Sequence, residues 1–322
     1  MARVLVTRRL TSGGTDPLVA AGHDIIGPLP DDAPMSADEL CEGAATSDAI
    51  VCLLTDRIDA AVLAAGAKGG RLRVVANAAV GYDNIDVATA HELGITVCNT
   101  PGVLDATTAD LAFLLILAAT RSSTEAEADL RQGRWQGWGF TTNLARDVHG
   151  ATLGLVGYGR IAQAVAQRAG GFSMEVLHTT RRDTGLPGYV PELDELLARA
   201  DIVSLHVPLT PATRHLIGRE QLARMKPTAV LINTARGPVV DEEALADALE
   251  AGHLHGAGLD VFDGEPAVNP RLLAAPRATL LPHIGSATIA TRTHMAQMAC
   301  QGVCDVLDGR TPPNQVLPDK AG

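Results

Sequence analysis

The sequence of 322 residues is poor in aromatic side chains, which make up only 3% of it. Hydrophobic residues nevertheless account for 46% of the chain, enough to build sizeable cores. These cores must therefore be aliphatic and rich in alanine. The length suggests two domains.

Cysteine is also scarce, and its spacing matters more than its number. The chain has five cysteines, at Cys41, Cys52, Cys98, Cys300 and Cys304, and none lies in a C-x-x-C pair. Cys300 and Cys304 share a helix face, but two thiols alone do not make a structural zinc site. We expect buried, reduced thiols in a cytoplasmic protein, and no metal site.

Long hydrophobic runs and an excess of basic charge are both missing. The run from Leu111 to Ala119 is about half of what a membrane span needs, and the apolar run after Met1 is too short for a signal peptide. The net charge is −11, which argues against a general nucleic-acid or acidic-membrane binder. We therefore expect no nucleic-acid partner and no membrane partner.

Glycine, in contrast, occurs in a pattern that indicates a binding turn between a strand and a helix. A short apolar run from Leu153 to Val156 leads into Gly157-Tyr-Gly159-Arg-Ile-Ala162, and a helix-like segment follows. In a G-x-G-x-x-A turn the first glycine permits the tight turn and the second lets the backbone approach a pyrophosphate. The small third residue allows close helix packing, and the helix N-terminus faces the phosphates. A further strand at βαβ distance makes this a dinucleotide-binding turn.

Strands alternate with helices along the whole chain, which predicts parallel sheets covered on both faces. After Gly150 six strands are expected, which is a full doubly wound sheet. They are Leu153–Val156, Val176–Thr180, Ile202–His206, Val230–Asn233, Gly258–Val261 and Thr279–Leu281. The first part of the chain has the same alternation without a glycine-rich phosphate turn. It includes a capping-box helix start at Ser36-Ala-Asp-Glu39.

The end of the chain sets the domain boundaries. Thr288 to Leu307 has the spacing of one long helix, which has no obvious packing site in a completed sheet. We infer that it returns to the N-terminal unit, and that the residues from Thr311 to Gly322 form a tail. The expected substrate-binding domain is 1–99 with 287–322, and the expected dinucleotide-binding domain is 100–286. The fold class is α/β: a Rossmann-type doubly wound parallel sheet plus a second, flavodoxin-like domain, discontinuous in sequence.

Three polar side chains at expected strand ends suit hydride transfer to a keto acid. Arg236 would hold the carboxylate and polarise the carbonyl. His283 would donate the proton, and Glu265 would orient His283 and stabilise its cation. Each also has a plain structural interpretation: a surface or capping arginine, a loop histidine, and a turn carboxylate. Their common position at the strand ends of one nucleotide fold favours the catalytic interpretation.

Other polar residues lack such placement. We interpret His91, His149, His215, His253, His255 and His294 as structural or exposed. Asp56, Asp59, Glu242 and Glu243 are interpreted as solvated faces or helix caps.

Motifs along nearly the whole chain resemble those of the D-isomer-specific 2-hydroxyacid dehydrogenase family. They are Val80-Gly-Tyr-Asp-Asn-Ile-Asp86, Asn99-Thr-Pro-Gly-Val103, the glycine turn, Ser204-Leu-His-Val-Pro-Leu-Thr210, Asn233-Thr-Ala-Arg-Gly237, Gly258-Leu-Asp-Val261, Glu265-Pro266 and Pro282-His-Ile-Gly-Ser-Ala-Thr288. Leu53-Leu-Thr-Asp56 and Gly133-Arg-Trp-Gln-Gly-Trp138 are similar to the glyoxylate/hydroxypyruvate reductase branch.

The resemblance implies roles for individual residues. Arg236, Glu265 and His283 would be catalytic, and the substrate would contact Arg236, His283, Leu53, the backbone N–H groups of Val80 and Gly81, and Trp138 from the partner subunit of a homodimer. The cofactor would contact Gly157, Gly159, Arg160, Ile161, Thr180, Arg181, Arg182, His206, Pro208, Thr213, Thr108, Thr234, Ala235, Asp260 and Gly285. The implied activity is reduction of a small anionic 2-keto acid, of the glyoxylate or hydroxypyruvate type, to the D-2-hydroxy acid.

Three positions depart from the family pattern. The family often has a Thr-Asp or Thr-Glu pair where this chain has Asp105-Ala106-Thr107. Phe140 stands where a proline is common, which affects the pocket wall. Thr180 stands where an acidic residue usually ends the second nucleotide strand and repels a 2′-phosphate. Because Arg181 and Arg182 follow Thr180, we predict that NADP(H) is preferred over NAD(H).

One alternative comes from another class, and a second, a phosphite or formate oxidiser, is closer. A dinucleotide-sensing co-repressor shares the fold and motifs, but such proteins usually have long disordered tails and a peptide-binding groove, whereas we expect almost no extension at either end here. Phosphite oxidisers have a lysine at the position of Val80, and formate oxidisers replace the glutamate at Glu265. These features favour the reductase.

Overall fold

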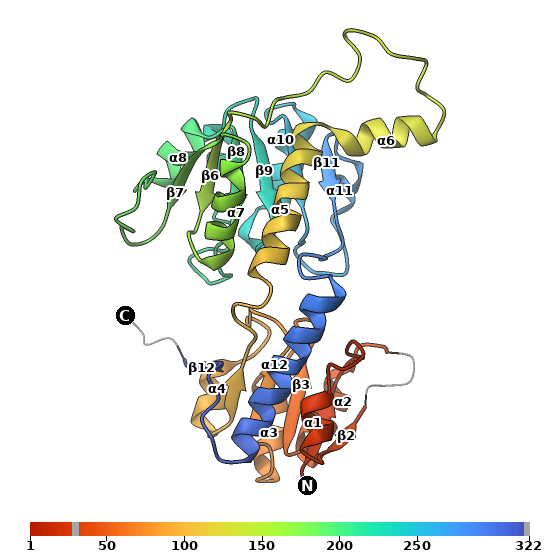
Figure 1. Cartoon of the computed structure of the whole chain (residues 1–322), viewed down its shortest axis with the longest axis vertical. Coiled ribbons are helices and arrows are strands. Elements are labelled where there is room, and N and C mark those ends of the chain that lie inside the picture. The colour runs from red at the N-terminus through yellow and green to blue at the C-terminus, as the bar shows by residue number, and fades with distance from the viewer. Residues whose placement is uncertain (28–31, 319–322) are drawn as a thin grey trace. The chain divides into compact units, whose positions relative to one another are not determined.

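The computed structural model describes residues 1–27 and 32–318. The chain forms two compact units: an N-terminal unit of Met1–Leu104 with Ser286–Gly322, and a central unit of Asp105–Gly285. Each unit contains a six-stranded sheet with helices on both faces (Figure 1). Both sheets were expected from the sequence, and the doubly wound α/β class is confirmed.

The N-terminal unit has a sheet that is parallel except at one edge. In sheet order its strands are β2 (Asp24–Ile26), β1 (Arg3–Val6), β3 (Ala49–Cys52), β4 (Val74–Asn77), β5 (Thr96–Cys98) and β12 (Gln315–Val316). Its helices are α1 (Asp16–Ala20), α2 (Ala37–Thr46), α3 (Ala60–Lys68), α4 (Val87–Glu92) and α12 (Ile289–Leu307).

Alternation along β1 shows how this sheet is covered. Val4 and Val6 face one core with residues of α1 and α12, while Leu5 faces the other core with residues of α2 and α3. This is the two-residue period of a strand buried on both faces. Ser36 and Glu39 form the expected capping box at the start of α2.

The C-terminal segment differs from the expected tail. Gln315 and Val316 form β12, which pairs antiparallel with β5 at Cys98 and Val97. A two-residue strand is too short to show a period, so the sequence pattern could not reveal it. The last part of the expected tail, 319–322, lies outside the described residues.

The central unit has a fully parallel sheet. In sheet order its strands are β7 (Glu175–Thr179), β6 (Thr152–Val156), β8 (Ile202–Leu205), β9 (Val230–Asn233), β10 (Gly256–Leu259) and β11 (Ala278–Leu280). Its helices are α5 (Asp105–Thr120), α6 (Ser123–Arg131), α7 (Arg160–Gly170), α8 (Leu193–Arg199), α9 (Arg219–Arg224), α10 (Glu242–Glu250) and α11 (Pro270–Ala274), with a 3₁₀ turn η1 (Gly237–Val239).

The order of these strands locates a switch point. The chain passes from β6 to β7 on one side, and β8 then lies on the other side of β6. Open α/β sheets bind ligands at the carboxyl ends of strands where the order reverses in this way. Helices α5 and α7 cover one face and α8, α9 and α10 cover the other. Helix α6, which the polar sequence of this segment did not suggest, has no buried residue.

Candidate active site

The glycine turn after β6 has the shape that a pyrophosphate requires. Gly157 has φ +88°, and a Cβ there would lie 2.6 Å from the carbonyl oxygen of His206. Gly159 caps α7, and no atom lies within 4 Å of the position that its Cβ would take. Ala162 is fully buried against the β6 side chains Leu153 and Leu155. The turn therefore fits a dinucleotide, with an open backbone at the helix N-terminus.

Arg236 is held by the turn that follows β9. The side chain of Asn233 accepts from the N–H of Ala235 at 3.0 Å and donates to the carbonyl of Arg236 at 2.9 Å. A Cβ on Gly237 would lie 1.9 Å from the carbonyl carbon of Phe262, so only glycine fits there. The Arg236 loop thus packs directly against the loop that carries Glu265.

Glu265 and His283 form a hydrogen-bonded pair. His283 Nδ1 lies 2.7 Å from Glu265 Oε2, and each side chain is about a quarter exposed, at 25%. Burial acts to raise the pKa of Glu265. The hydrogen bond from His283, the N–H of Phe262 and the charges of His283 and Arg236 outweigh it and hold the pKa below its usual value. An ionised carboxylate can only accept hydrogen bonds, so Nδ1 carries a proton and donates a hydrogen bond to Glu265.

This pairing leaves the other ring nitrogen of His283 available. Within the described part of the chain, Nε2 has no hydrogen-bond partner. His283 also has φ +53°, a left-handed conformation uncommon for a residue with a side chain. Such strain persists only where surrounding contacts impose it.

Asp260 imposes part of that conformation. It is almost fully buried after β10, and its two carboxylate oxygens accept from the N–H groups of Ile284 and Gly285, each at 2.8 Å. Burial raises the pKa of Asp260 to about 6, although these N–H groups and the charge of His283 act in the opposite direction. The segment after His283 is therefore fixed by Asp260, while the imidazole is fixed by Glu265.

The structure brings the three residues proposed as catalytic together on adjoining loops of the central unit. Several residues expected to contact the cofactor lie at the same edge of the sheet. Thr108 is buried on α5, with Oγ1 3.6 Å from where a Gly285 Cβ would lie. The hydroxyl of Thr234 is buried and has no partner among the described residues. Thr213 donates to the carbonyl of Pro208 at 2.6 Å, and His206 pairs with Ser204 at 2.9 Å.

The second nucleotide strand ends one residue earlier than expected, at Thr179. The hydroxyl of Thr180 donates to the carbonyl of Arg182. The side chains of Arg181 and Arg182 are exposed, and neither has an ion pair or hydrogen bond within the described part of the chain. Arg160, at the start of α7, lies 3.7 Å from the carboxylate of Asp105.

The residues expected to contact the substrate from the N-terminal unit also follow strand ends. Leu53 follows β3, and Val80 and Gly81 lie in the loop after β4; all three are half-buried. Trp138 belongs to the central unit and is 83% exposed, beyond the end of α6.

The interpretation of Asp56 as a solvated or helix-capping residue is wrong. Asp56 is 2% exposed, and its Oδ2 accepts from the N–H of Leu53 at 2.8 Å and from the hydroxyl of Thr7. Asp59, in contrast, does cap α3. Sequence reasoning gave no role to Asn77 and named Asn99 only within a family motif; the available signal for Asn77 was a single amide that ends the apolar run Val74–Ala76.

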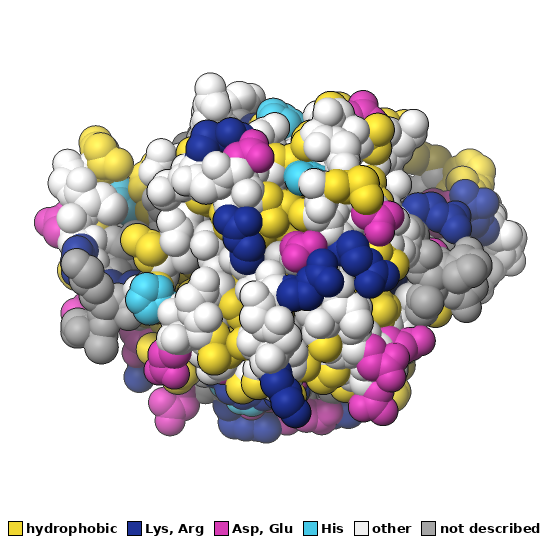
Figure 2. All heavy atoms as spheres, turned by 90° about the horizontal axis from the view of Figure 1, so that it is seen from below, with side chains coloured by type: hydrophobic (Ala, Val, Ile, Leu, Met, Phe, Trp, Pro, Cys, Tyr) yellow, Lys and Arg dark blue, Asp and Glu magenta, His cyan; other side chains and the backbone are white. Residues whose placement is uncertain are grey.

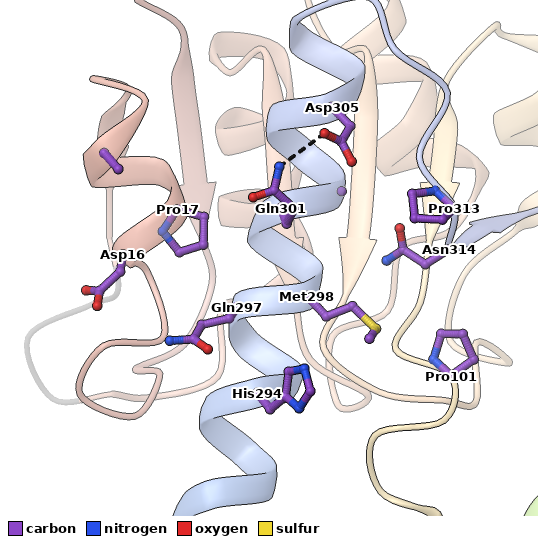
Figure 3. A pocket seen from close by; sticks show the side chains of 12 residues that line it. Asp16, Pro17, Pro101, His294, Gln297, Met298, Gln301, Asp305, Pro313 and Asn314 are labelled. Carbon is purple, nitrogen blue, oxygen red and sulfur yellow. Dashed lines mark hydrogen bonds between the residues drawn. The ribbon is translucent and has the colours of Figure 1, made fainter.

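A groove of about 740 Å³ lies along α12 in the N-terminal unit (Figure 3). Three prolines, Met298 and several amides line it, and the carboxylate of Asp305 accepts from Gln301 at 3.1 Å. None of the expected site residues lines this groove. This groove is therefore not the site that the sequence predicts.

Two kinds of site are absent from the described residues. No cluster of three or more histidine, cysteine, aspartate or glutamate side chains could hold a metal ion there. None of the helices in the described ranges combines the length and apolarity needed to cross a membrane.

Comparison with known proteins agrees with this geometry. A family model for the D-isomer specific 2-hydroxyacid dehydrogenase NAD binding domain matches residues 113–285, more than half of the chain. The chain is 48% identical over 323 residues to a glyoxylate reductase of Korarchaeum cryptofilum, covering 98% of this chain and 95% of that one.

Solved structures are similar over the same length. A protein of Thermus thermophilus superposes with a TM-score of 0.89 at 46% identity, covering 98% of this chain and 100% of that one. An NADPH-dependent glyoxylate/hydroxypyruvate reductase of Sinorhizobium meliloti, in complex with NADP and malonate, has a TM-score of 0.85 at 34% identity, covering 98% and 96%. The chain therefore belongs to the D-isomer specific 2-hydroxyacid dehydrogenase family.

Proposed function

We propose that this enzyme reduces glyoxylate, or a similarly small 2-keto acid such as hydroxypyruvate, to the D-2-hydroxy acid with NADPH. The observation that carries the proposal is the His283–Glu265 pair beside the Arg236 loop of a dinucleotide-binding sheet, with Nε2 of His283 making no hydrogen bond to any residue that the structure describes. The bound dinucleotide supplies the hydride.

The side chains of this chain would perform the remaining chemistry. Arg236 binds the substrate carboxylate and polarises the keto oxygen. His283 donates a proton from Nε2 to the oxygen that becomes the hydroxyl group. Glu265, whose lowered pKa keeps it ionised, stabilises the imidazolium and holds the ring in position. We further propose that the N–H groups of Val80 and Gly81 bind the substrate carboxylate, with Leu53 nearby.

The finer proposal for the cofactor is a preference for NADPH over NADH. No carboxylate ends the second strand to repel a 2′-phosphate, and the guanidinium groups of Arg181 and Arg182 are unpaired within the described chain. Because the hydroxyl of Thr180 already donates to the chain, the phosphate contact is assigned to the two arginines. We propose the remaining cofactor contacts as expected from the sequence, Thr108 included.

The decisive experiment measures kcat/KM for a panel of 2-keto acids with NADPH and NADH side by side. We expect the highest values for glyoxylate and hydroxypyruvate, with at least a roughly tenfold preference for NADPH. No reduction of any 2-keto acid would instead favour a dinucleotide-sensing binding protein.

The arginine assignment has its own test. Arg181→Ala and Arg182→Ala should reduce the NADPH preference in at least one case, while kcat/KM with NADH stays close to that of the wild type. Arg224→Ala, an exposed arginine elsewhere in the central unit, is the matched control. An unchanged preference in both variants would show that another group binds the phosphate.

We also propose a homodimer in the cytoplasm. Exposed apolar side chains on α5 and beyond α6 suit a subunit interface, and the five cysteines are free thiols.

A further inference from the structure

The loop after β4 has three successive peptide groups whose carbonyl oxygens are all held by the protein. The carbonyl of Ala79 accepts from the N–H of Thr100 at 2.9 Å. The carbonyl of Val80 accepts from Asn99 Nδ2, and that of Gly81 from Asn77 Nδ2, each at 2.8 Å.

The N–H groups of the same three peptides are left without protein acceptors. Within the described chain, the N–H groups of Val80, Gly81 and Tyr82 donate to no protein atom. In a trans peptide the N–H points opposite to the C=O. Holding the three carbonyls therefore turns the three N–H groups away from the atoms that hold them, toward the half-exposed side of the loop.

The two asparagines are well placed to hold the carbonyls of Val80 and Gly81 rigidly. Asn77 is the last residue of β4 and is 0% exposed. Its Oδ1 faces the thiol of Cys52 at 3.6 Å, and its Nδ2 also donates to Asn84 Oδ1 at 3.0 Å. Asn99 follows β5, the neighbouring strand, and its backbone carbonyl accepts from Asn314 Nδ2 at 2.7 Å. Both amides thus project from ordered strand ends.

We propose that Asn99 and Asn77 are positioning residues that aim the N–H groups of Gly81 and Tyr82 at the substrate carboxylate, beside the N–H of Val80, whose peptide is held by the backbone of Thr100. This rests on the proposed function and extends it, because it adds Tyr82 as a third donor and names the side chains that orient the N–H groups of Gly81 and Tyr82. Oriented successive N–H groups are an established way to bind an anion. Asn77 and Asn99 themselves would not touch the substrate.

Steady-state kinetics of Asn99→Ala and Asn77→Ala test the positioning role. Each variant should raise the KM for glyoxylate about tenfold or more, while kcat changes less and the Kd for NADPH stays within about threefold. The matched control is Asn314→Ala, which removes another buried amide donor from the same sheet edge but leaves the carbonyls of Val80 and Gly81 held. It should lower Tm without raising the KM.

A titration of the wild-type protein covers the case in which a variant fails to fold. In ¹⁵N-labelled protein saturated with NADPH, oxalate should shift the amide resonances of Val80, Gly81 and Tyr82 together. A glyoxylate KM within twofold of wild type in both variants, or a Tyr82 amide that oxalate leaves unmoved, would overturn the proposal. If wild type reduces no 2-keto acid, the proposed function fails instead, and the oxalate titration still decides whether these N–H groups bind a carboxylate.

Discussion

The hydrogen bond between Glu265 and His283 couples the charges of the two side chains. Glu265 has a lowered pKa and is ionised near neutral pH, so its negative charge favours the protonated imidazole. Glu265→Gln removes this charge but keeps an acceptor oxygen. The limb of the pH–kcat profile at which reduction is lost as pH rises should therefore move to lower pH.

This shift is measured by kcat for glyoxylate reduction across the pH range. Glu243→Gln is the control, because Glu243 pairs with Arg271 on the surface of the same unit. An unchanged profile in Glu265→Gln would remove Glu265 from its role.

His283 has a left-handed backbone, so two substitutions can distinguish loss of the proton donor from loss of stability. Asparagine tolerates φ near +53°, whereas alanine does not tolerate it well. His283→Asn should lose about 10²- to 10⁴-fold in kcat because the proton donor is gone, with Tm close to wild type. His283→Ala should lose similar activity and about 1 kcal/mol more stability. Thermal melts and kcat of the two variants check this, and near-wild-type turnover of His283→Asn would end the assignment.

At the scale of an element, the glycine turn between β6 and α7 uses its two glycines for different purposes. Gly157 needs its positive φ, and its Cβ would collide with the backbone of His206. Gly159 has φ −74° and open space around its Cβ position. Gly157→Ala should therefore lose both stability and dinucleotide binding, whereas Gly159→Ala should keep its Tm and lose binding alone.

Fluorescence titration with NADPH and thermal melts of the two variants provide the measurement. If Gly159→Ala binds NADPH as tightly as wild type, the phosphates do not approach the backbone at Gly159. The dinucleotide would then have to bind elsewhere on the unit.

For the whole molecule, the surface gives evidence about partners. In the view of Figure 2, basic and acidic side chains are interspersed, with no broad area of either sign on the described part of that face. Apolar side chains are exposed on the central unit instead: Leu114 on α5, and Trp135, Trp138 and Phe140 beyond α6. Exposed apolar groups of this kind mark interaction sites, which supports the proposed isologous dimer.

Leu114→Arg should therefore weaken self-association, and Trp138→Ala should change the preference among 2-keto acids more than the Kd for NADPH. Sedimentation should give twice the chain mass of 33.5 kDa for wild type. Leu273→Arg, at another exposed leucine, should leave the dimer intact. A wild-type protein that sediments as an active monomer would contradict the dimer and the role of Trp138.

The sequence by itself determined the two α/β units, the glycine turn, and the strand ends that carry Arg236, Glu265 and His283. These follow from local signals: apolar runs of strand length, a helix start at Ser36, and glycines that a phosphate turn requires. Such signals locate an element because its buried positions recur with the period of a helix or a strand. Once a strand is located, the residues that directly follow it are located as well.

Only the tertiary structure decided the features that depend on distant partners. Strand β12 exists because Gln315 and Val316 meet β5, and Asp56 is buried because Thr7 and Leu53 surround its carboxylate. The proposed roles of Asn77 and Asn99 depend on which carbonyls accept hydrogen bonds from their amides. The sequence around an asparagine does not indicate which acceptor its side chain will reach. Periodicity records which side of an element is buried, whereas hydrogen-bond partners are chosen by the packing of segments far apart in the chain.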